Sequence, residues 1–100
     1  MYVAMNRFKI ALGKEADFIN IWKNRETFLD EVPGFKSFNL LQGKTDETCT
    51  LFASHSVWAS EEAFIGWTKS DAFRKAHANA KPATDIYLVP PYIDGFIAVL

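Results

Sequence analysis

Residues 60–77 read Ser-Glu-Glu-Ala-Phe-Ile-Gly-Trp-Thr-Lys-Ser-Asp-Ala-Phe-Arg-Lys-Ala-His and contain two helix starts in quick succession. Ser60 precedes two glutamates and Ser70 precedes an aspartate, so each start combines a hydroxyl cap with acidic residues in the first turn. Such side chains satisfy free backbone N–H groups and interact favourably with the helix dipole. The pattern predicts two short helices, residues 60–67 and 70–80.

The segments around this stretch alternate between strand and helix patterns. Apolar and polar residues alternate over residues 2–10, which predicts a strand, and residues 14–30 follow helical spacing. Strands are then expected at residues 35–41 and 48–58 around a turn at 43–46, and a Pro-containing loop at 81–91 leads to a last strand at 92–100. With the broken helix counted once, the order is β-α-β-β-α-β. We therefore expect one α+β domain, residues 1–100, with a ferredoxin-like antiparallel sheet and helices on one face.

The composition excludes several classes of function. The chain of 100 residues is 49% hydrophobic and carries nine Phe, three Trp and three Tyr, which suggests an aromatic cavity or an interface. Its net charge of −1 comes from interspersed charges, so nucleic-acid binding is not expected. There is one cysteine, no signal-peptide pattern and no apolar run near the roughly 20 residues of a membrane span. We expect a cytoplasmic protein that is not bound to a membrane.

Two of the expected strands are apolar on both faces. In the last strand, Phe96, Ala98 and Leu100 alternate with Ile93, Ile97 and Val99, and residues 48–58 behave similarly. Helices on one face would leave the other apolar face in water, which is uncommon for a monomer. A two-fold homodimer packed sheet against sheet is therefore expected.

His77 is the first candidate for a functional side chain. It shares a predicted apolar helix stripe with Phe73, Ala76 and Ala80. A histidine on such a face is either a hydrogen-bonded core residue or a metal ligand. The small alanine side chains beside it would leave room for a flat ligand.

Asn6 is the second candidate, because an amide is unusual in the middle of a strand whose other residues on that face point inward. It is either a structural amide bound to a nearby loop or a donor aimed at a ligand. Trp67 could be a core residue or a rigid wall against an aromatic ligand. Trp22 and Arg25 could add a second wall and a cation, or could be ordinary core and surface residues.

The remaining candidates are weaker. His55 could be a second ligand, but it is interpreted as an interface residue or a hydrogen-bonded structural residue. Four cations surround the broken helix and could pair with ligand carboxylates or be solvated: Lys69, Arg74, Lys75 and Lys81. No glycine-rich phosphate loop, zinc-ligand spacing or nucleophile elbow is present in the sequence, so those chemistries have no residues to use.

Taken together, these residues resemble the IsdG-type haem-degrading monooxygenases of the antibiotic biosynthesis monooxygenase (ABM) superfamily. The resemblance extends over nearly the whole chain. It is strongest at Met5-Asn6-Arg7, at Val32-Pro33-Gly34-Phe35, and from Val57-Trp58 through Trp67 to His77. It implies a dimeric α+β barrel.

The resemblance also implies roles for individual residues. His77 would be the axial ligand of the haem iron, Asn6 a distal hydrogen-bond donor, and Trp67 a ring that presses on the porphyrin. Haem would be both substrate and cofactor, O₂ would be consumed, and electrons would come from an external donor or reductase. The residues expected to contact haem are Asn6, Trp22, Arg25, Phe64, Trp67, Phe73 and His77.

Two other functions fit the same pattern. A cofactor-independent ABM oxygenase acting on a quinol or polyketide phenol would use His77 as a general base. A haem carrier or sensor would bind haem without degrading it.

Overall fold

A computed structural model describes residues 1–25, 29–71, 73–74 and 85–100 of the chain. Its strands are β1 (Tyr2–Ala11), β2 (Phe35–Thr45), β3 (Cys49–Trp58) and β4 (Tyr92–Ile97). Its helices are α1 (Glu15–Lys23), the 3₁₀ turn η1 (Leu29–Glu31) and α2 (Glu61–Thr68). All strand pairs are antiparallel, in the order β2-β3-β1-β4. This topology confirms the ferredoxin-like α+β fold.

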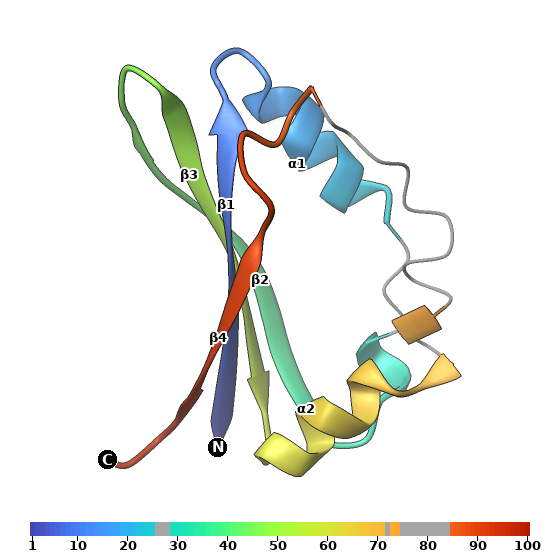
Figure 1. Ribbon diagram of the computed structural model, residues 1–100. Helices are drawn as coiled ribbons and strands as arrows, with labels where there is room; N and C mark the ends of the chain where they lie inside the picture. The colour runs from blue at the N-terminus through green and yellow to red at the C-terminus, as the bar shows by residue number, and fades with distance from the viewer. Residues whose placement is uncertain (26–28, 72, 75–84) are drawn as a thin grey trace.

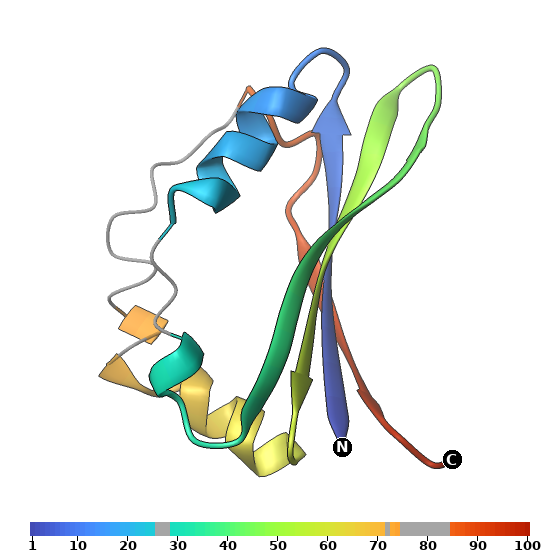
Figure 2. The ribbon, with the colours of Figure 1, turned by 180° about the vertical axis from the view of Figure 1, so that it is seen from behind.

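Both α-helices lie on the same face of the sheet, near opposite ends of it (Figures 1 and 2). We call this the inner face. Tyr2, Ala4, Phe8 and Ile10 of β1 are buried there, as the alternation in the sequence predicted. Phe18, the fully buried residue of α1, packs against Phe8 and Phe52.

The core consists of two separate clusters under the two helices. The first lies under α1 and contains Phe8, Ile10, Phe18, Phe52 and Ile86. The second lies under α2 and contains Tyr2, Ala4, Leu29 and Trp58. Among the described residues, neither α-helix packs directly on the part of the sheet between the two clusters.

The prediction of a first helix over residues 14–30 is wrong about where the helix ends. α1 ends at Lys23, where the backbone N–H of Arg25 bonds to the carbonyl of Trp22 at 3.3 Å and closes a tighter last turn. Leu29 belongs to the core cluster under α2, whereas Phe18 belongs to the one under α1. Burial of Leu29 in the second cluster therefore favours an end of the helix before this residue.

The turn that follows is set by Pro33 and Gly34. The N–H of Phe35 bonds to the carbonyl of Val32 at 3.2 Å, and Gly34 has φ +86°, a backbone conformation that glycine adopts readily. A Cβ added at Gly34 would lie 2.5 Å from the Cβ of Ala63 in α2. Glycine therefore permits both the turn and the close approach of α2.

Both serine caps of residues 60–77 are confirmed. Ser60 Oγ accepts a hydrogen bond from the N–H of Ala63 at 3.2 Å, and Ser70 Oγ accepts one from the N–H of Phe73 at 3.1 Å. Arg74 pairs with Asp71 on the surface. The rest of the predicted second helix lies outside the described residues.

Two strand ends differ from the prediction. β4 ends at Ile97, so Ala98, Val99 and Leu100 are not part of the strand. β2 continues beyond the predicted end at residue 41 to Thr45, so the strand takes in most of the predicted turn at 43–46 and the chain reverses from Asp46 onward. The Asp46 carboxylate accepts hydrogen bonds from the N–H groups of Thr48 and Cys49 at 2.7 and 2.9 Å, and from Thr48 Oγ1 at 2.8 Å.

Asp46→Ala is expected to lower the unfolding midpoint at pH 7, because these three hydrogen bonds are lost. The same bonds, those from the backbone first, hold the pKa of Asp46 below its usual value. A carboxyl group with a lowered folded-state pKa stabilises the fold above its unfolded pKa, and this contribution is lost as the pH falls through the folded value. Melting curves should therefore show a difference between wild type and variant that narrows below about pH 4. Glu47→Ala is the control, and an equal loss there would contradict the assignment.

The other side of the sheet, which we call the outer face, has no helix over it in Figures 1 and 2. Val3, Val57 and Phe96 form one cross-strand row on it, and Phe96 is 49% exposed. Leu41, Leu51 and Tyr92 are also exposed. Within the described part of the chain, no helix is long and apolar enough to cross a membrane.

Candidate functional site

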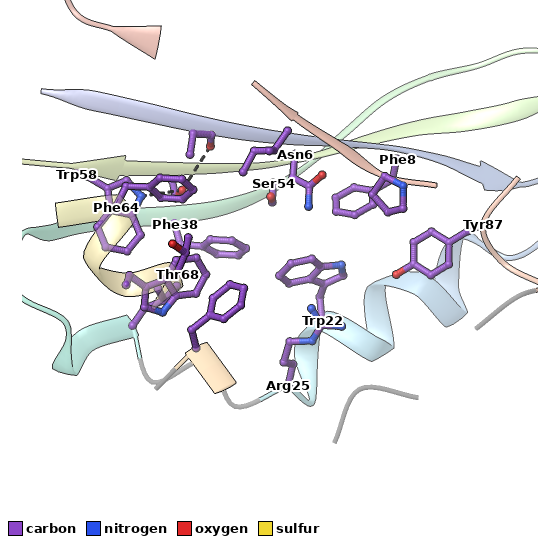
Figure 3. Close-up of a pocket in the computed structure, with 17 residues that line it drawn as sticks. Asn6, Phe8, Trp22, Arg25, Phe38, Ser54, Trp58, Phe64, Thr68 and Tyr87 are labelled. Atoms are coloured by element: carbon purple, nitrogen blue, oxygen red, sulfur yellow. Dashed lines mark hydrogen bonds between the residues drawn. The ribbon is translucent and has the colours of Figure 1, made fainter. Parts of the chain in front are cut away.

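A cavity of about 500 Å³ lies between the two core clusters, against the inner face of the sheet (Figure 3). Small side chains of β1 and β3 form its floor, namely Ala4, Ser54 and Ser56. Ser54 and Ser56 occupy alternate positions of β3, so both face inward. The small floor residues leave space that larger side chains would fill.

Aromatic rings form most of the walls. Eight of them line the cavity: Phe8, Trp22, Phe38, Trp58, Phe64, Trp67, Phe73 and Tyr87. These residues confirm the expectation from composition that some of the aromatic side chains would line a cavity.

The wall near α2 is held together by ring contacts. Trp58 is fully buried, and its ring centroid lies 5.4 Å from that of Trp67 and 5.6 Å from that of Phe64. Phe73 packs edge-on against Trp67 at 4.9 Å. The indole N–H of Trp58 donates to Ser56 Oγ at 2.9 Å, so this wall is fixed to the sheet by a buried hydrogen bond.

The wall near α1 is built around Trp22. Its indole stacks on Phe38 with centroids 5.4 Å apart and meets the edge of Phe8 at 5.9 Å. The guanidinium carbon of Arg25 lies 4.5 Å from the centroid of the Trp22 ring, a cation–π distance. Arg25 is half-buried, and it brings a positive charge to the cavity.

Asn6 projects from β1 into the cavity, beside its cross-strand partner Ser54 and above Trp22 (Figure 3). Its amide oxygen is buried, and so is the indole nitrogen of Trp22; neither atom has a hydrogen-bond partner among the described residues. An unsatisfied buried polar group costs roughly 1–3 kcal/mol. Such groups therefore indicate a partner other than the described residues.

Tyr87 is a cavity residue that the sequence analysis missed. It follows the buried Ile86 in the segment before β4, and its hydroxyl points toward Trp22 in Figure 3. Burial raises the pKa of this phenol above its usual value, and the nearby charge of Arg25 opposes the rise. An apolar Ile-Tyr pair inside the predicted loop was the available signal.

The cavity brings together six of the seven side chains expected to contact the ligand: Asn6, Trp22, Arg25, Phe64, Trp67 and Phe73. The seventh, His77, lies outside the described residues, as do Lys75 and Lys81. Lys69 and Arg74 are exposed and do not line the cavity. His55 lies on the outer face, opposite Met5 and Asn39. The described residues contain no group of three or more His, Cys, Asp or Glu side chains that could hold a metal ion.

Comparison with known proteins assigns the chain to a family. Residues 1–79 match the sequence profile of the family described as antibiotic biosynthesis monooxygenase. The chain belongs to this family. The ABM chain is also 29% identical over 80 residues to heme oxygenase (staphylobilin-producing) 1 of Staphylococcus aureus, which covers 80% of this chain and 74% of that protein.

Solved structures show the same fold. The heme-degrader MhuD from Mycobacterium tuberculosis, solved with two hemes in its active site, superposes with a TM-score of 0.76 at 24% identity, covering 100% of this chain and 97% of that one. SnoaB, a cofactor-independent oxygenase from Streptomyces nogalater, superposes with a TM-score of 0.69 at 19% identity, covering 99% and 93%. The ABM fold is thus shared by relatives of different chemistry.

Proposed function

We propose that this ABM protein is a haem-degrading monooxygenase. The observation that carries the proposal is Asn6, whose buried amide oxygen has no partner among the described residues and which faces a largely aromatic cavity. The similarity to a haem oxygenase over 80% of the chain supports the same substrate. The proposed location is the cytoplasm, where the buried, unpaired Cys49 would stay reduced.

The cavity fits a porphyrin in size and character. Its volume of about 500 Å³ is within the range of roughly 300–1,000 Å³ typical of small-molecule sites. Flat aromatic walls on both sides suit a planar macrocycle. The few polar groups inside it, on Asn6, Ser54 and Arg25, would fix the orientation of such a ligand.

Each residue has a distinct part in the proposed reaction. Haem is the substrate, and its own iron supplies the reactivity toward O₂, with electrons from an external donor or reductase. His77 would hold the iron from the proximal side, as the family resemblance implies. Asn6 would hydrogen-bond on the distal side, and Trp67, packed between Trp58 and Phe73, would press on the ring. The aromatic walls would exclude water.

The outer face supports a homodimer as part of the proposal. The row Val3–Val57–Phe96 and the exposed Leu41 and Leu51 make an apolar surface that a second copy would cover. A two-fold axis would place the same surface on both partners. Two sheets packed in this way would form the dimeric barrel.

A turnover experiment tests the function against its alternatives. Purified protein with haemin, ascorbate and air is expected to lose the porphyrin absorbance and release iron that a ferrous chelator detects. A haem carrier would keep a stable ferrous or oxygenated spectrum under these conditions. Oxidation of a model quinol by metal-free protein that has no haem affinity would instead identify a cofactor-independent oxygenase.

Asn6→Ala is expected to bind haemin within about threefold of wild type but to degrade it at least about tenfold more slowly. One hydrogen bond to a charged or strongly polar group contributes about 1.5 kcal/mol or more, and this energy corresponds to a tenfold change in rate. Affinity comes from a Soret titration and rate from the decay of the same band. Asn39→Ala removes an exposed amide from the outer face and should leave both unchanged. Equal rates for Asn6→Ala and wild type would contradict the role.

A further inference from the structure

The side-chain amide of Asn6 has two ends of opposite hydrogen-bonding character, so its orientation decides what it offers to a ligand. Its NH₂ group donates hydrogen bonds, whereas its carbonyl oxygen accepts them. The role proposed above requires the NH₂ group to face the ligand. The carbonyl oxygen is buried and has no hydrogen-bond partner among the described residues. A donor that engages this oxygen would fix the amide in the required orientation.

Ser54 carries a hydroxyl group beside this amide. The two residues are cross-strand partners in β1 and β3, and both side chains line the cavity next to each other (Figure 3). Directly opposed residues on one face of an antiparallel pair have Cβ atoms about 4.5–5.5 Å apart. No direct hydrogen bond from Ser54 reaches the amide oxygen of Asn6. The donor is therefore close to the oxygen without bonding to it, a spacing that suits one intervening water molecule.

The hydroxyl of Ser54 is available for such a contact, in contrast to that of Ser56 on the same strand. Ser56 Oγ donates to the carbonyl of Ala4 at 3.4 Å and accepts from the indole N–H of Trp58 at 2.9 Å. In the described part of the chain, no comparable partner engages the hydroxyl of Ser54, although this residue is only 8% exposed. A buried water molecule needs a roomy site with two to four polar partners. The cavity floor at Asn6 and Ser54 meets this requirement.

We propose that Ser54 is a positioning residue for Asn6 and acts through one bridging water molecule. The Ser54 hydroxyl donates to the water, and the water donates to the carbonyl oxygen of Asn6, which leaves the NH₂ group for the ligand. A bridging water of this kind is enthalpically nearly as good as a direct hydrogen bond. The inference rests on the proposed function only for the identity of the ligand, because the link between Ser54 and Asn6 can be tested without haem.

The pair Ser54→Thr and Ser54→Val tests the link in the haem-free protein, because threonine and valine have the same shape and only threonine keeps the hydroxyl. The unfolding constant of Ser54→Val divided by that of Ser54→Thr should be about fivefold larger with Asn6 present than in an Asn6→Ala background. Equal ratios in the two backgrounds would overturn the link. A crystal structure of the wild type should show a water within about 3.2 Å of both oxygens. A direct bond, or no water there, would overturn the bridge.

Fluoride binding to the ferric haem complex tests the orientation of the amide, because a hydrogen-bond donor facing the iron stabilises the bound anion. Ser54→Thr should bind fluoride within about twofold of wild type, and Ser54→Val about fivefold more weakly. Equal affinities of these two variants would overturn the positioning role.

Ser37→Val is the matched control, because Ser37 is an exposed serine of β2 that lies opposite Val57 on the outer face. It should bind fluoride as wild type does, and a loss equal to that of Ser54→Val would also overturn the positioning role. Coupling between Ser54 and Asn6 in a protein that neither binds nor degrades haem would instead support the link and refute the proposed function.

Discussion

His77→Ala is expected to reduce haem degradation by about 100-fold or more. If His77 is the axial ligand, this change removes the bond that fixes the iron beneath Asn6. Loss of a hydrogen-bond partner of a metal ligand already costs about 10–100-fold in other proteins, so loss of the ligand itself should cost at least as much. The measurement is the rate of Soret decay with ascorbate and air, together with the spectrum of the ferric complex.

Exogenous imidazole separates loss of the ligand from loss of structure. Imidazole added to His77→Ala should restore part of the ferric spectrum and part of the rate, because a free ligand can occupy the space left by the side chain. His55→Gln changes the other histidine, which lies on the outer face, and should keep the wild-type spectrum. Turnover by His77→Ala at the wild-type rate would contradict the assignment of His77 as the axial ligand.

Phe96→Glu is expected to raise the dissociation constant of the proposed homodimer more than 100-fold. The side chain is 49% exposed in the single chain and lies beside Val3, so a carboxylate there costs the protomer little. In a sheet-to-sheet dimer the same carboxylate would be buried without a partner, at a cost of roughly 3–5 kcal/mol. Sedimentation of the variant should show monomers at concentrations where wild type is dimeric.

Ile65→Glu is the matched control for this variant. Ile65 lies in α2, on the opposite side of the sheet, and is 42% exposed, close to the value for Phe96. It should remain dimeric, since it introduces the same charge away from the outer face. Dissociation of both variants would point to a general effect of charge, and a wild type that sediments as a monomer would contradict the dimer.

Local signals predicted most of the fold. The alternation in β1 placed Ala4, Phe8 and Ile10 on the buried face, and the serine caps located both helix starts after β3. These features depend on residues that are close together in the sequence, so they can be predicted from the sequence alone. The end of α1 was missed because Leu29 follows helical spacing but is drawn into a different core cluster by tertiary packing.

The site was only partly predictable, for a similar reason. Asn6 stands out as an unusual residue type in a strand, and Trp67 was singled out as a possible aromatic wall and by the family resemblance, so the sequence analysis named both. Tyr87 did not stand out, because its place in the cavity depends on the contact of its segment with β1, far away in the sequence. The two inward serines of β3 were also overlooked, although small polar residues at alternate positions of a strand could have indicated the floor of a cavity.

The most direct test of the account is an absorbance titration of the purified protein with haemin, followed by ascorbate in air. A porphyrin bound between the aromatic walls and coordinated by a histidine should give a shifted Soret band that saturates at a fixed ratio of haem to protein. The band should then decay when reductant and oxygen are supplied. A spectrum identical to that of free haemin throughout the titration would contradict the account.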